Sequence, residues 1–253
     1  MVTGRPWNSL GDCDVFRRTA FAFLLLLGAC AGPEPEGPPL SGAPRWHAVL
    51  VAGDPSLPVW DNATAAMAER LRLGLASVRV LSARRADAER ATSDATLAAI
   101  AALRPGLGEG CLVFVTAHGA QNRGLSMVAS GDHLPFFGLD RALRDGCGAA
   151  PTVVVLSGCY SGMYVAPPVA RANRIVLTAS RADRMSFGCS AGREFTVFDR
   201  CLLDAIIPGR SWREVATTVN TCVTAEEGKL RISSSSEPQT FFGNGVTHLT
   251  TLK

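Results

Sequence analysis

Five short runs of mostly apolar residues limit the architecture of this chain more than any other feature of its sequence. They lie at residues 46–52, 78–81, 112–117, 152–156 and 174–179. Strands that are buried on both faces have this composition, and they occur in parallel sheets that helices cover. The runs therefore predict a buried parallel sheet.

Stretches with helical spacing separate these runs. Met67, Leu71 and Leu75, for example, recur at every fourth position, which places them on one side of a helix. Helices are predicted over 62–75, from an N-cap at Ser93 to Pro105, and over 136–144, 195–207 and 212–224. Strands that alternate with helices indicate βαβ units, so we predict an α/β protein with helices on both faces of the sheet.

The composition is that of a folded globular protein. Of the 253 residues, 47% are hydrophobic and 19% are charged, which excludes a disordered chain. The formal net charge of +3 is too small to indicate a nucleic-acid partner. No C-x-x-C or H-E-x-x-H motif occurs, and His47, His133 and His248 adjoin no ligand-like residues. We therefore expect no metal and no cofactor.

The amino-terminal part of the chain has the organisation of an export signal. Arg17 and Arg18 precede an apolar run at 19–27, and two small residues separate that run from Cys30. The run is too short to cross a hydrocarbon core of about 30 Å, but its length suits a secretory signal. The stretch that ends at Cys30 resembles the bacterial lipobox, which implies cleavage before Cys30 and its lipidation. A plain secretory signal with an incidental cysteine is the alternative.

These segments predict three regions of the chain. Residues 1–29 form the signal peptide, residues 30–44 the lipidated cysteine and a Pro/Gly-rich tether, and residues 45–253 the folded domain. Several acyl chains together hold a protein on a membrane, so the lipobox implies a lipid anchor in the bacterial cell envelope. Ala31 stands where signals for the inner membrane usually carry Asp, which favours the outer membrane, facing the periplasm.

Two reactive side chains follow the ends of predicted strands. His118 comes directly after the run at 112–117, and Cys159 follows the run at 152–156 closely. Ligands bind beyond the carboxyl ends of parallel strands, so we expect both side chains at one edge of the sheet. A thiolate attacks carbonyl groups, and a nearby His moves the proton. The N–H groups of Gly119 and Cys159 are candidates for an oxyanion hole.

Each of these residues alone also has a structural explanation. Cys159 suits a small buried hydrophobic position, and His118 suits a loop histidine with satisfied hydrogen bonds. The local sequence G-C-Y-S-G is not the hydrolase motif G-x-S-x-G, because Tyr160 stands where that nucleophile would. The position of both residues at strand ends, each beside a glycine, favours a functional pair.

These motifs resemble the legumain family of cysteine peptidases, in the caspase-like clan. The resemblance rests on an apolar strand that ends in His118-Gly119 and a second that ends in Cys159-Tyr160-Ser161-Gly162. Residues 177–180, 186–189 and 195–198 also resemble bacterial members. The resemblance covers roughly residues 46–207.

The resemblance implies a three-layer αβα caspase-like fold with a mainly parallel sheet. It implies that Cys159 is the nucleophile, that His118 is the general acid/base and that Gly119 belongs to the oxyanion hole. A peptide or protein substrate would be hydrolysed through a thioester, without metal or cofactor. A transamidase or ligase with the same dyad, and a non-catalytic lipoprotein binding module on the same fold, are the alternatives. The sequence assigns neither a third catalytic residue nor an oligomeric state.

The residues that would select the substrate depart from the legumain pattern. Legumains carry an Arg-His pair after the first strand, and the Arg helps to read Asn or Asp beside the cleaved bond. This chain has Asp61 and Asn62 in the comparable stretch. In a pocket, Asp61 would favour Arg or Lys, whereas a helix cap at Asp61 or Asn62 is the structural alternative. Asp183 and Glu194 are further candidates for the pocket wall.

The eight cysteines divide by position. Cys13 lies in the leader, Cys30 is the predicted lipid site and Cys159 the predicted nucleophile. The other five are Cys111, Cys147, Cys189, Cys201 and Cys222. An odd number leaves at least one thiol free, and export permits disulfides. Cys111 and Cys147 lie near the starts of neighbouring predicted strands, so we expect one bridge between them, far from Cys159.

Overall fold

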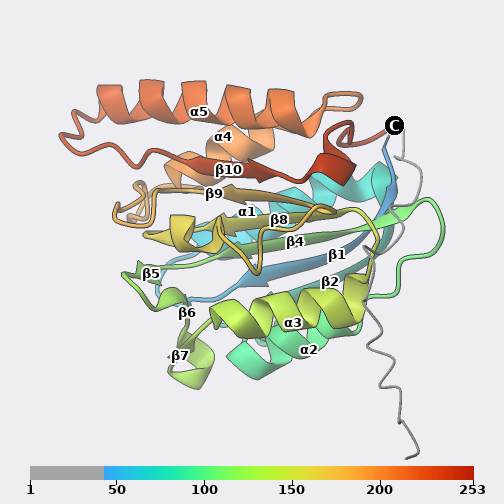
Figure 1. Cartoon of the computed structure of the whole chain (residues 1–253). Coiled ribbons are helices and arrows are strands. Elements are labelled where there is room, and N and C mark those ends of the chain that lie inside the picture. Colours follow the sequence, from blue (N-terminus) through green and yellow to red (C-terminus); the bar gives the residue numbers. More distant parts are fainter. Residues whose placement is uncertain (1–42) are drawn as a thin grey trace, which may run out of the picture. The chain divides into compact units, whose positions relative to one another are not determined.

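The computed structural model describes residues 43–253, and its centre is a seven-stranded sheet (Figure 1). The strands lie in the order β10-β9-β8-β4-β1-β2-β3. Their bounds are β1 Arg45–Ala52, β2 Leu75–Ser82, β3 Glu89–Arg90, β4 Glu109–Thr116, β8 Thr152–Ser157, β9 Arg174–Thr178 and β10 Gln239–Phe242. Neighbouring strands are parallel except β10, which runs antiparallel to β9. The prediction of a mainly parallel sheet is therefore confirmed.

Helices cover both faces of this sheet (Figure 1). The α1 face is covered by α1 (Val59–Leu71), α4 (Val197–Ala205) and α5 (Trp212–Lys229), and the α2 face by α2 (Ser93–Ala101) and α3 (Phe136–Cys147). Successive strand residues alternate between the two faces. Leu50 and Phe114 accordingly pack in the core under the α1 face, and Val49 and Val113 pack in the core under the α2 face. The domain thus has three layers.

Shorter elements follow the ends of the strands. A second sheet, of three short strands, lies beyond the end of β4. These elements are β5 Gly119–Ala120, β6 Gly124–Met127 and β7 Asp132–His133, and the 3-10 turns are η1 Arg72–Gly74, η2 Val128–Ser130, η3 Ser161–Tyr164 and η4 Asn244–Val246. We call the edge where β1, β4 and β8 end the carboxyl edge.

The first helix begins earlier than its apolar spacing predicts. α1 starts at Val59 directly after Pro58 and ends at Leu71, and Leu75 already belongs to β2. The fixed backbone angle of proline suits a helix start. No side chain caps this helix, so the alternative in which Asp61 or Asn62 caps it is wrong. Periodicity alone did not detect the start because Val59 and Trp60 precede the amphipathic pattern.

Other boundaries also differ from the prediction. The N-cap of α2 is Thr92 and not Ser93, because the Thr92 hydroxyl accepts a hydrogen bond from the N–H of Ala95. α5 runs on to Lys229, five residues beyond the predicted end. The sequence did not predict β10, a four-residue strand that contains two polar residues and pairs only with β9.

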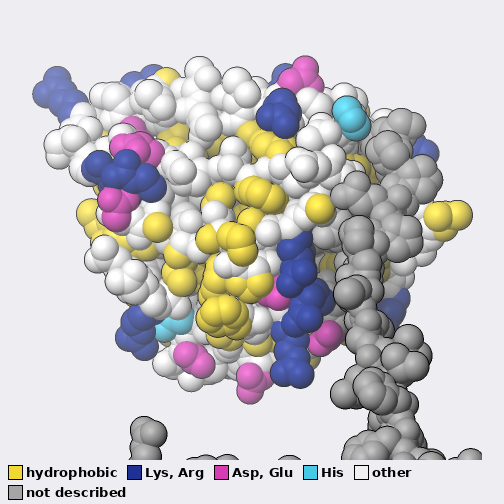
Figure 2. Space-filling view, in the orientation of Figure 1, with side chains coloured by type: hydrophobic (Ala, Val, Ile, Leu, Met, Phe, Trp, Pro, Cys, Tyr) yellow, Lys and Arg dark blue, Asp and Glu magenta, His cyan; other side chains and the backbone are white. Residues whose placement is uncertain are grey.

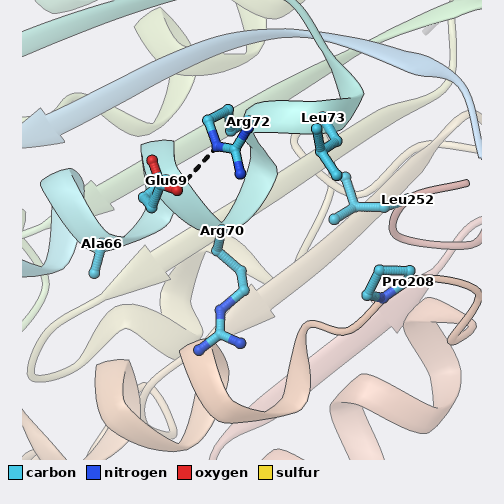
Figure 3. A pocket seen from close by; sticks show the side chains of 7 residues that line it. All are labelled: Ala66, Glu69, Arg70, Arg72, Leu73, Pro208 and Leu252. Atoms are coloured by element: carbon cyan, nitrogen blue, oxygen red, sulfur yellow. Dashed lines mark hydrogen bonds and ion pairs between the residues drawn. The ribbon is translucent and has the colours of Figure 1, made fainter.

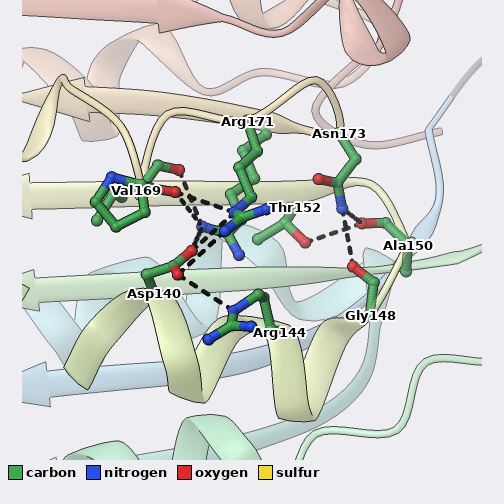
Figure 4. A network of polar contacts seen from close by, with 10 residues as sticks. Asp140, Arg144, Gly148, Ala150, Thr152, Val169, Arg171 and Asn173 are labelled. Carbon is green, nitrogen blue, oxygen red and sulfur yellow. Dashed lines mark hydrogen bonds and ion pairs between the residues drawn. The ribbon is translucent and has the colours of Figure 1, made fainter. Parts of the chain in front are cut away.

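One polar network ties α3 to the start of β9 (Figure 4). The carboxylate of Asp140 on α3 accepts hydrogen bonds from Arg171 and Arg174, each at 2.9 Å, and also pairs with Arg144 at 3.2 Å. Burial raises the pKa of Asp140, but the hydrogen bonds from Arg171 and Arg174 outweigh burial and leave the pKa below its usual range. Only 5% of the Asp140 side chain and 1% of Arg174 are exposed, so the network stabilises the packing of α3 on β9.

The surface of the domain carries charges of both signs. Figure 2 shows basic and acidic side chains scattered among apolar ones over one face of the molecule. Within residues 43–253 no helix is both long and apolar enough to cross a membrane. The predicted signal peptide, Cys30 and most of the tether lie outside the described residues, and β1 begins at Arg45, where the folded domain is predicted to start.

Candidate active site

His118 and Cys159 follow two strands that are direct neighbours in the sheet. The last pair between β4 and β8 joins Thr116 to Ser157. His118 and Cys159 each lie two residues beyond that pair, and because side chains alternate along a strand, both belong to the α1 face. Thr116 confirms this face, since its hydroxyl donates to Asp199 of α4 at 2.8 Å. The chain therefore brings the predicted pair to one side of the carboxyl edge.

The main chain around this pair is closely packed. A Cβ atom on Gly119 would lie only 2.0 Å from the carbonyl oxygen of Cys159, so no other residue fits there without displacing the backbone. Tyr160, next to the cysteine, has a left-handed backbone with φ of 59°. Its N–H donates to the carbonyl of Arg184 at 2.8 Å. These contacts fix the turn that carries the thiol.

The side chains of the pair have different surroundings. The sulfur of Cys159 accepts a hydrogen bond from the N–H of Ser186 at 3.3 Å and contacts the Ser186 carbonyl oxygen at 3.5 Å. His118 is exposed, and its ring lies against the ring of Trp60 of α1, with 4.9 Å between centroids. Within residues 43–253 no hydrogen bond joins His118 to Cys159. Catalytic hydrogen bonds often tighten only when substrate is bound.

The segment between β9 and α4 folds across the carboxyl edge. Ser180 donates to the carbonyl of Gly158 at 3.1 Å, and the carbonyl of Phe187 accepts from the N–H of Val197 at 3.0 Å. At its far end, the side-chain amide of Asn62 on α1 donates to the carbonyl of Glu194 at 3.0 Å. The segment thus runs from the thiol to α1 and α4 and forms a wall beside the reactive pair.

Cys189, one of the five cysteines to which the sequence analysis assigns no catalytic or lipid-attachment role, lies in this wall. It packs against the apolar cluster of Ala52, Val59 and Trp60. Burial raises the pKa of the Cys189 thiol, and the neighbouring Cys159 adds to that shift. Cys159 and Cys189 are the free cysteines of the described residues.

The three candidate pocket residues lie in three different places. The carboxylate of Asp61 is buried and accepts a hydrogen bond from Ser82 at the end of β2 at 2.6 Å. Asp183 is exposed, and the Arg181 guanidinium lowers its pKa to about 2. Glu194 is exposed and pairs with Arg200 at 3.2 Å. None of these carboxylates forms a hydrogen bond to His118 or Cys159 within residues 43–253.

A buried acid that the sequence analysis did not single out lies behind the reactive pair. Asp199, in the first turn of α4, is fully buried and accepts from the hydroxyl of Thr116. Burial raises the pKa of Asp199, and the hydroxyls of Ser157, Thr116 and Thr196 oppose that shift. The one signal in the sequence was a carboxylate among apolar residues of a predicted helix, between Phe198 and Cys201.

Two disulfides account for four cysteines. Cys111 of β4 joins Cys147 at the end of α3, which is the pairing expected from the sequence. Cys201 of α4 joins Cys222 of α5, a bridge that was not predicted. The remaining cysteine of the odd five is Cys189.

Two hollows of the domain have linings that include neither His118 nor Cys159. One, of about 400 Å³, lies at the end of α1 far from the carboxyl edge (Figure 3). It is lined by Ala66, Glu69, Arg70, Arg72, Leu73, Pro208 and Leu252. A second, of about 360 Å³, lies at the start of α4 and includes Glu194. In the part of the chain that the structure describes, no group of three His, Cys, Asp or Glu side chains is arranged to hold a metal ion.

Known structures share this architecture. Caspase-1 from Spodoptera frugiperda matches with a TM-score of 0.62 at 16% identity, over 87% of this chain and 96% of that one. The structure of pro-sf-caspase-1 matches with a TM-score of 0.57 at 15% identity, over 82% of this chain and 93% of that one. At these identities the likeness shows the fold, and the prediction of a three-layer caspase-like fold is confirmed. No curated protein matched the sequence.

A family model matches the part of the chain that contains the reactive pair. The peptidase C13 family matches residues 97–223, which include His118, Cys159 and the segment between β9 and α4. This match spans half of the 253 residues. The family is legumain-like and belongs to the caspase clan, as the motifs suggested. The chain therefore belongs to the peptidase C13 family of cysteine peptidases.

Proposed function

We propose that this protein is a cysteine endopeptidase in which Cys159 is the nucleophile and His118 the general acid/base. The observation that carries the proposal is their shared position, two residues beyond the pair Thr116–Ser157 and on the same face of the sheet. Membership of a peptidase family supports a peptide or protein substrate.

The proposed acylation step needs only these two side chains and the backbone beside them. The sulfur of Cys159 attacks the carbonyl carbon of the scissile bond, and the thiol proton passes to His118. The C–N bond then breaks, and His118 gives its proton to the leaving amine. The N–H groups of Gly119 and Cys159 are the candidate donors to the carbonyl oxygen during this step.

Deacylation reverses the roles of the same groups. A water molecule attacks the thioester, His118 accepts one proton from it, and the C–S bond breaks to release the carboxylic acid. The proton returns to the sulfur of Cys159. If an amine attacks in place of water, the product is a new amide, so the identity of the product separates a peptidase from a transamidase.

The test is a panel of fluorogenic peptides on the wild type, Cys159→Ala and His118→Ala, with products identified by mass spectrometry. We expect each substitution to lower kcat/KM by about 10³-fold or more. Cys189→Ala, which removes the other free thiol of residues 43–253, is the matched control and should keep most of the activity. If no peptide is cleaved and an acyloxymethyl-ketone probe does not label Cys159, the proposal is wrong.

We also propose that the mature protein is anchored to a membrane through lipidated Cys30, in the bacterial envelope and at the outer membrane. The support is the lipobox-like sequence before Cys30 and the Pro-rich residues 31–44. In a bacterial host with two membranes, the wild type should fractionate with outer membranes and carry acyl groups on Cys30, whereas Cys30→Ser should not. An unmodified Cys30 on the mature wild-type protein would contradict the anchor.

A further inference from the structure

Two strongly exposed leucines lie at the end of the sheet where β1, β2 and β4 begin, which we call the amino edge. Leu107 is fully exposed and Leu73 is 79% exposed. Together with Phe137 at the start of α3, they are the most exposed large apolar side chains within residues 43–253. Single exposed apolar residues are ordinary on a protein surface, but apolar side chains gathered at one place mark an interaction site.

The register of the sheet places the two leucines on either side of β1. Leu73 lies two residues before the first pair of β2 with β1, and Leu107 lies two residues before Glu109, the partner of Arg45. β2 and β4 are the two neighbours of β1, each about 4.8 Å from it (Figure 1). Both leucines therefore flank the point at which the chain enters the sheet.

The loop that carries Leu107 is held in a closed turn. The N–H of Gly106 donates to the carboxylate of Glu109 at 2.8 Å, and the N–H of Glu109 donates to the carbonyl of Gly106 at 3.1 Å. Gly108 has a φ of 76°, in the left-handed region that suits glycine. These contacts fix the turn with its leucine exposed at the tip.

Leu73 borders the hollow of about 400 Å³ at the end of α1 (Figure 3). Its apolar neighbours in the lining are Leu252 and Pro208, and Arg70 and Arg72 contribute guanidinium groups to the same lining. The hollow thus combines apolar side chains with positive charge.

Arginines surround the two leucines. The exposed ones are Arg45, Arg70, Arg72 and Arg104. Glu69 pairs with Arg72 at 2.9 Å, and Glu109 pairs with His47 at 2.7 Å. The other three arginines form no ion pair within residues 43–253. Exposed apolar side chains with basic ones beside them suit the surface of a bilayer that contains anionic lipids.

The amino edge is also the end of the domain from which the chain leads back to Cys30. Residues 31–44 separate Cys30 from β1 and span about 40 Å when extended. A lipid on Cys30 would keep the amino edge within this distance of the bilayer. At the resulting high effective concentration, even a weak contact with the bilayer is populated.

We propose that the amino edge is a membrane-contact surface. Leu73 and Leu107 enter the headgroup region of the bilayer, and the arginines beside them bind the phosphates of anionic phospholipids. This inference rests on the proposed lipid anchor and adds a second contact with the same membrane. It also orients the domain, because the strands run away from this edge and leave His118 and Cys159 at the end of the sheet that is far from the lipid.

The test places a tryptophan at the edge of the lipidated protein. The native tryptophans of residues 43–253, Trp46, Trp60 and Trp212, are buried. The vesicles contain phosphatidylethanolamine and phosphatidylglycerol with brominated acyl chains, which quench tryptophan fluorescence at close range. In Leu107→Trp, these vesicles should remove about half or more of the added fluorescence, because the side chain lies at the boundary between headgroups and acyl chains. With phosphatidylcholine in place of phosphatidylglycerol the quenching should be weaker, because the arginines lose their anionic partners.

Phe137→Trp is the matched control. Phe137 is also strongly exposed, but it lies about 15 Å along α3 from Cys147, which is bonded to Cys111 near the start of β4. The fluorescence added by this substitution should not change with bromination. Equal quenching of both variants would overturn the proposed orientation, and equal quenching of Leu107→Trp in both kinds of vesicle would overturn the role of the arginines.

The remaining outcomes separate this surface from the anchor. With Cys30 acylated, absence of quenching in Leu107→Trp would overturn the surface and leave the anchor in place. A blue-shifted emission of Leu107→Trp without vesicles would show that a second copy of the chain covers the edge, which also overturns the inference. If Cys30 is not acylated, the anchor is wrong. Quenching of Leu107→Trp by the same vesicles would then support the surface alone, and its absence would remove both.

Discussion

Gly119 shows how a single residue holds the two halves of the site together. The residue follows His118 directly, and its α-carbon lies against the main chain of Cys159, where a Cβ would come within 2.0 Å of the carbonyl oxygen. The sequence suggested a different reason for this glycine, namely access of a substrate oxygen to its N–H. The structure adds that this glycine allows the main chain after His118 to lie in close contact with the main chain of Cys159.

Substitution of Gly119 should therefore damage catalysis more than folding. Gly119→Ala must push the Cys159 backbone away, and a misplacement of about 1 Å costs about 100-fold in rate. Peptidase assays and thermal melts should show that loss of kcat with a small change in Tm. Gly228→Ala, where a Cβ meets nothing within 4 Å, is the control and should keep full activity. Full activity of Gly119→Ala would show that the contact is unimportant.

The residues of the candidate site differ in how far their positions could be predicted from the sequence. His118 and Cys159 could be predicted because each follows an apolar run, and the end of a buried strand is a local property. The positions of Asp199 and Cys189 could not be predicted, because they depend on the path of the segment between β9 and α4 and on the packing of α4. Asp61 was suggested as a pocket residue, but its hydrogen bond goes to Ser82 at the end of β2.

At the scale of the elements, the packing of α3 on β9 depends on one buried carboxylate, that of Asp140. Asp140 is the shared acceptor for Arg144, Arg171 and Arg174. Removal of one partner leaves buried charge uncompensated, which costs about 3 kcal/mol or more. Asp140→Asn should therefore lower the free energy of unfolding by that amount at neutral pH.

The effect of Asp140→Asn should also depend on pH. Because the folded pKa of Asp140 lies below its usual range, its contribution is fully present above the unfolded value of about 4 and is lost as the pH falls through the folded value. Denaturant melts of both proteins from pH 7 to pH 3 should show the difference shrinking below about pH 4. A difference that stays constant over this range would contradict the ionic explanation.

Two helices of the α1 face, α4 and α5, are joined covalently. Cys201 of α4 and Cys222 of α5 are 21 residues apart in the sequence. A disulfide that closes a loop of this size stabilises the folded protein by about 3 kcal/mol. The double substitution Cys201→Ala and Cys222→Ala should lower Tm, and the wild type under reducing conditions should lose at least as much, because reduction also opens the bridge between Cys111 and Cys147. Cys189→Ala is the control, and a Tm of the double variant equal to that of the control would contradict the prediction.

The helices and strands also differ in whether sequence patterns could predict them. The buried strands and the amphipathic parts of the helices could be predicted, since burial on both faces gives a strand a continuous apolar run and burial of one side gives a helix a regular apolar spacing. β10 could not, because an edge strand with two polar residues in four is defined by its pairing to β9 and not by its own composition. The start of α1 is likewise set by Pro58 and by the packing of Trp60 on His118.

At the scale of the whole domain, the chain enters at one end of the sheet and carries its site at the other. β1 begins at Arg45, and β4 and β8 run parallel to it, so His118 and Cys159 lie at the end opposite this entry. A strand of eight residues spans about 26 Å. The proposed tether would therefore attach far from the thiol.

Anchoring should consequently leave the chemistry of the site unchanged. The purified lipidated protein in vesicles and the Cys30→Ser protein in solution should cleave a small peptide with kcat/KM values within about twofold, because the chain enters at the end of the sheet opposite His118 and Cys159. A large difference for the small peptide would show that the anchor and the site are coupled.

The pairing of the cysteines has a consequence for how the chain matures. In order along the sequence, the cysteines of the domain are Cys111, Cys147, Cys159, Cys189, Cys201 and Cys222. Both disulfides join neighbours in this order, 111 to 147 and 201 to 222. In a chain that emerges amino end first into an oxidising compartment, Cys111 and Cys147 are thus both present before Cys159 appears, whereas Cys159 and Cys189 both precede Cys201 and Cys222. The first bridge can therefore close without competition from the proposed nucleophile, whereas the second has to form in the presence of two earlier free thiols.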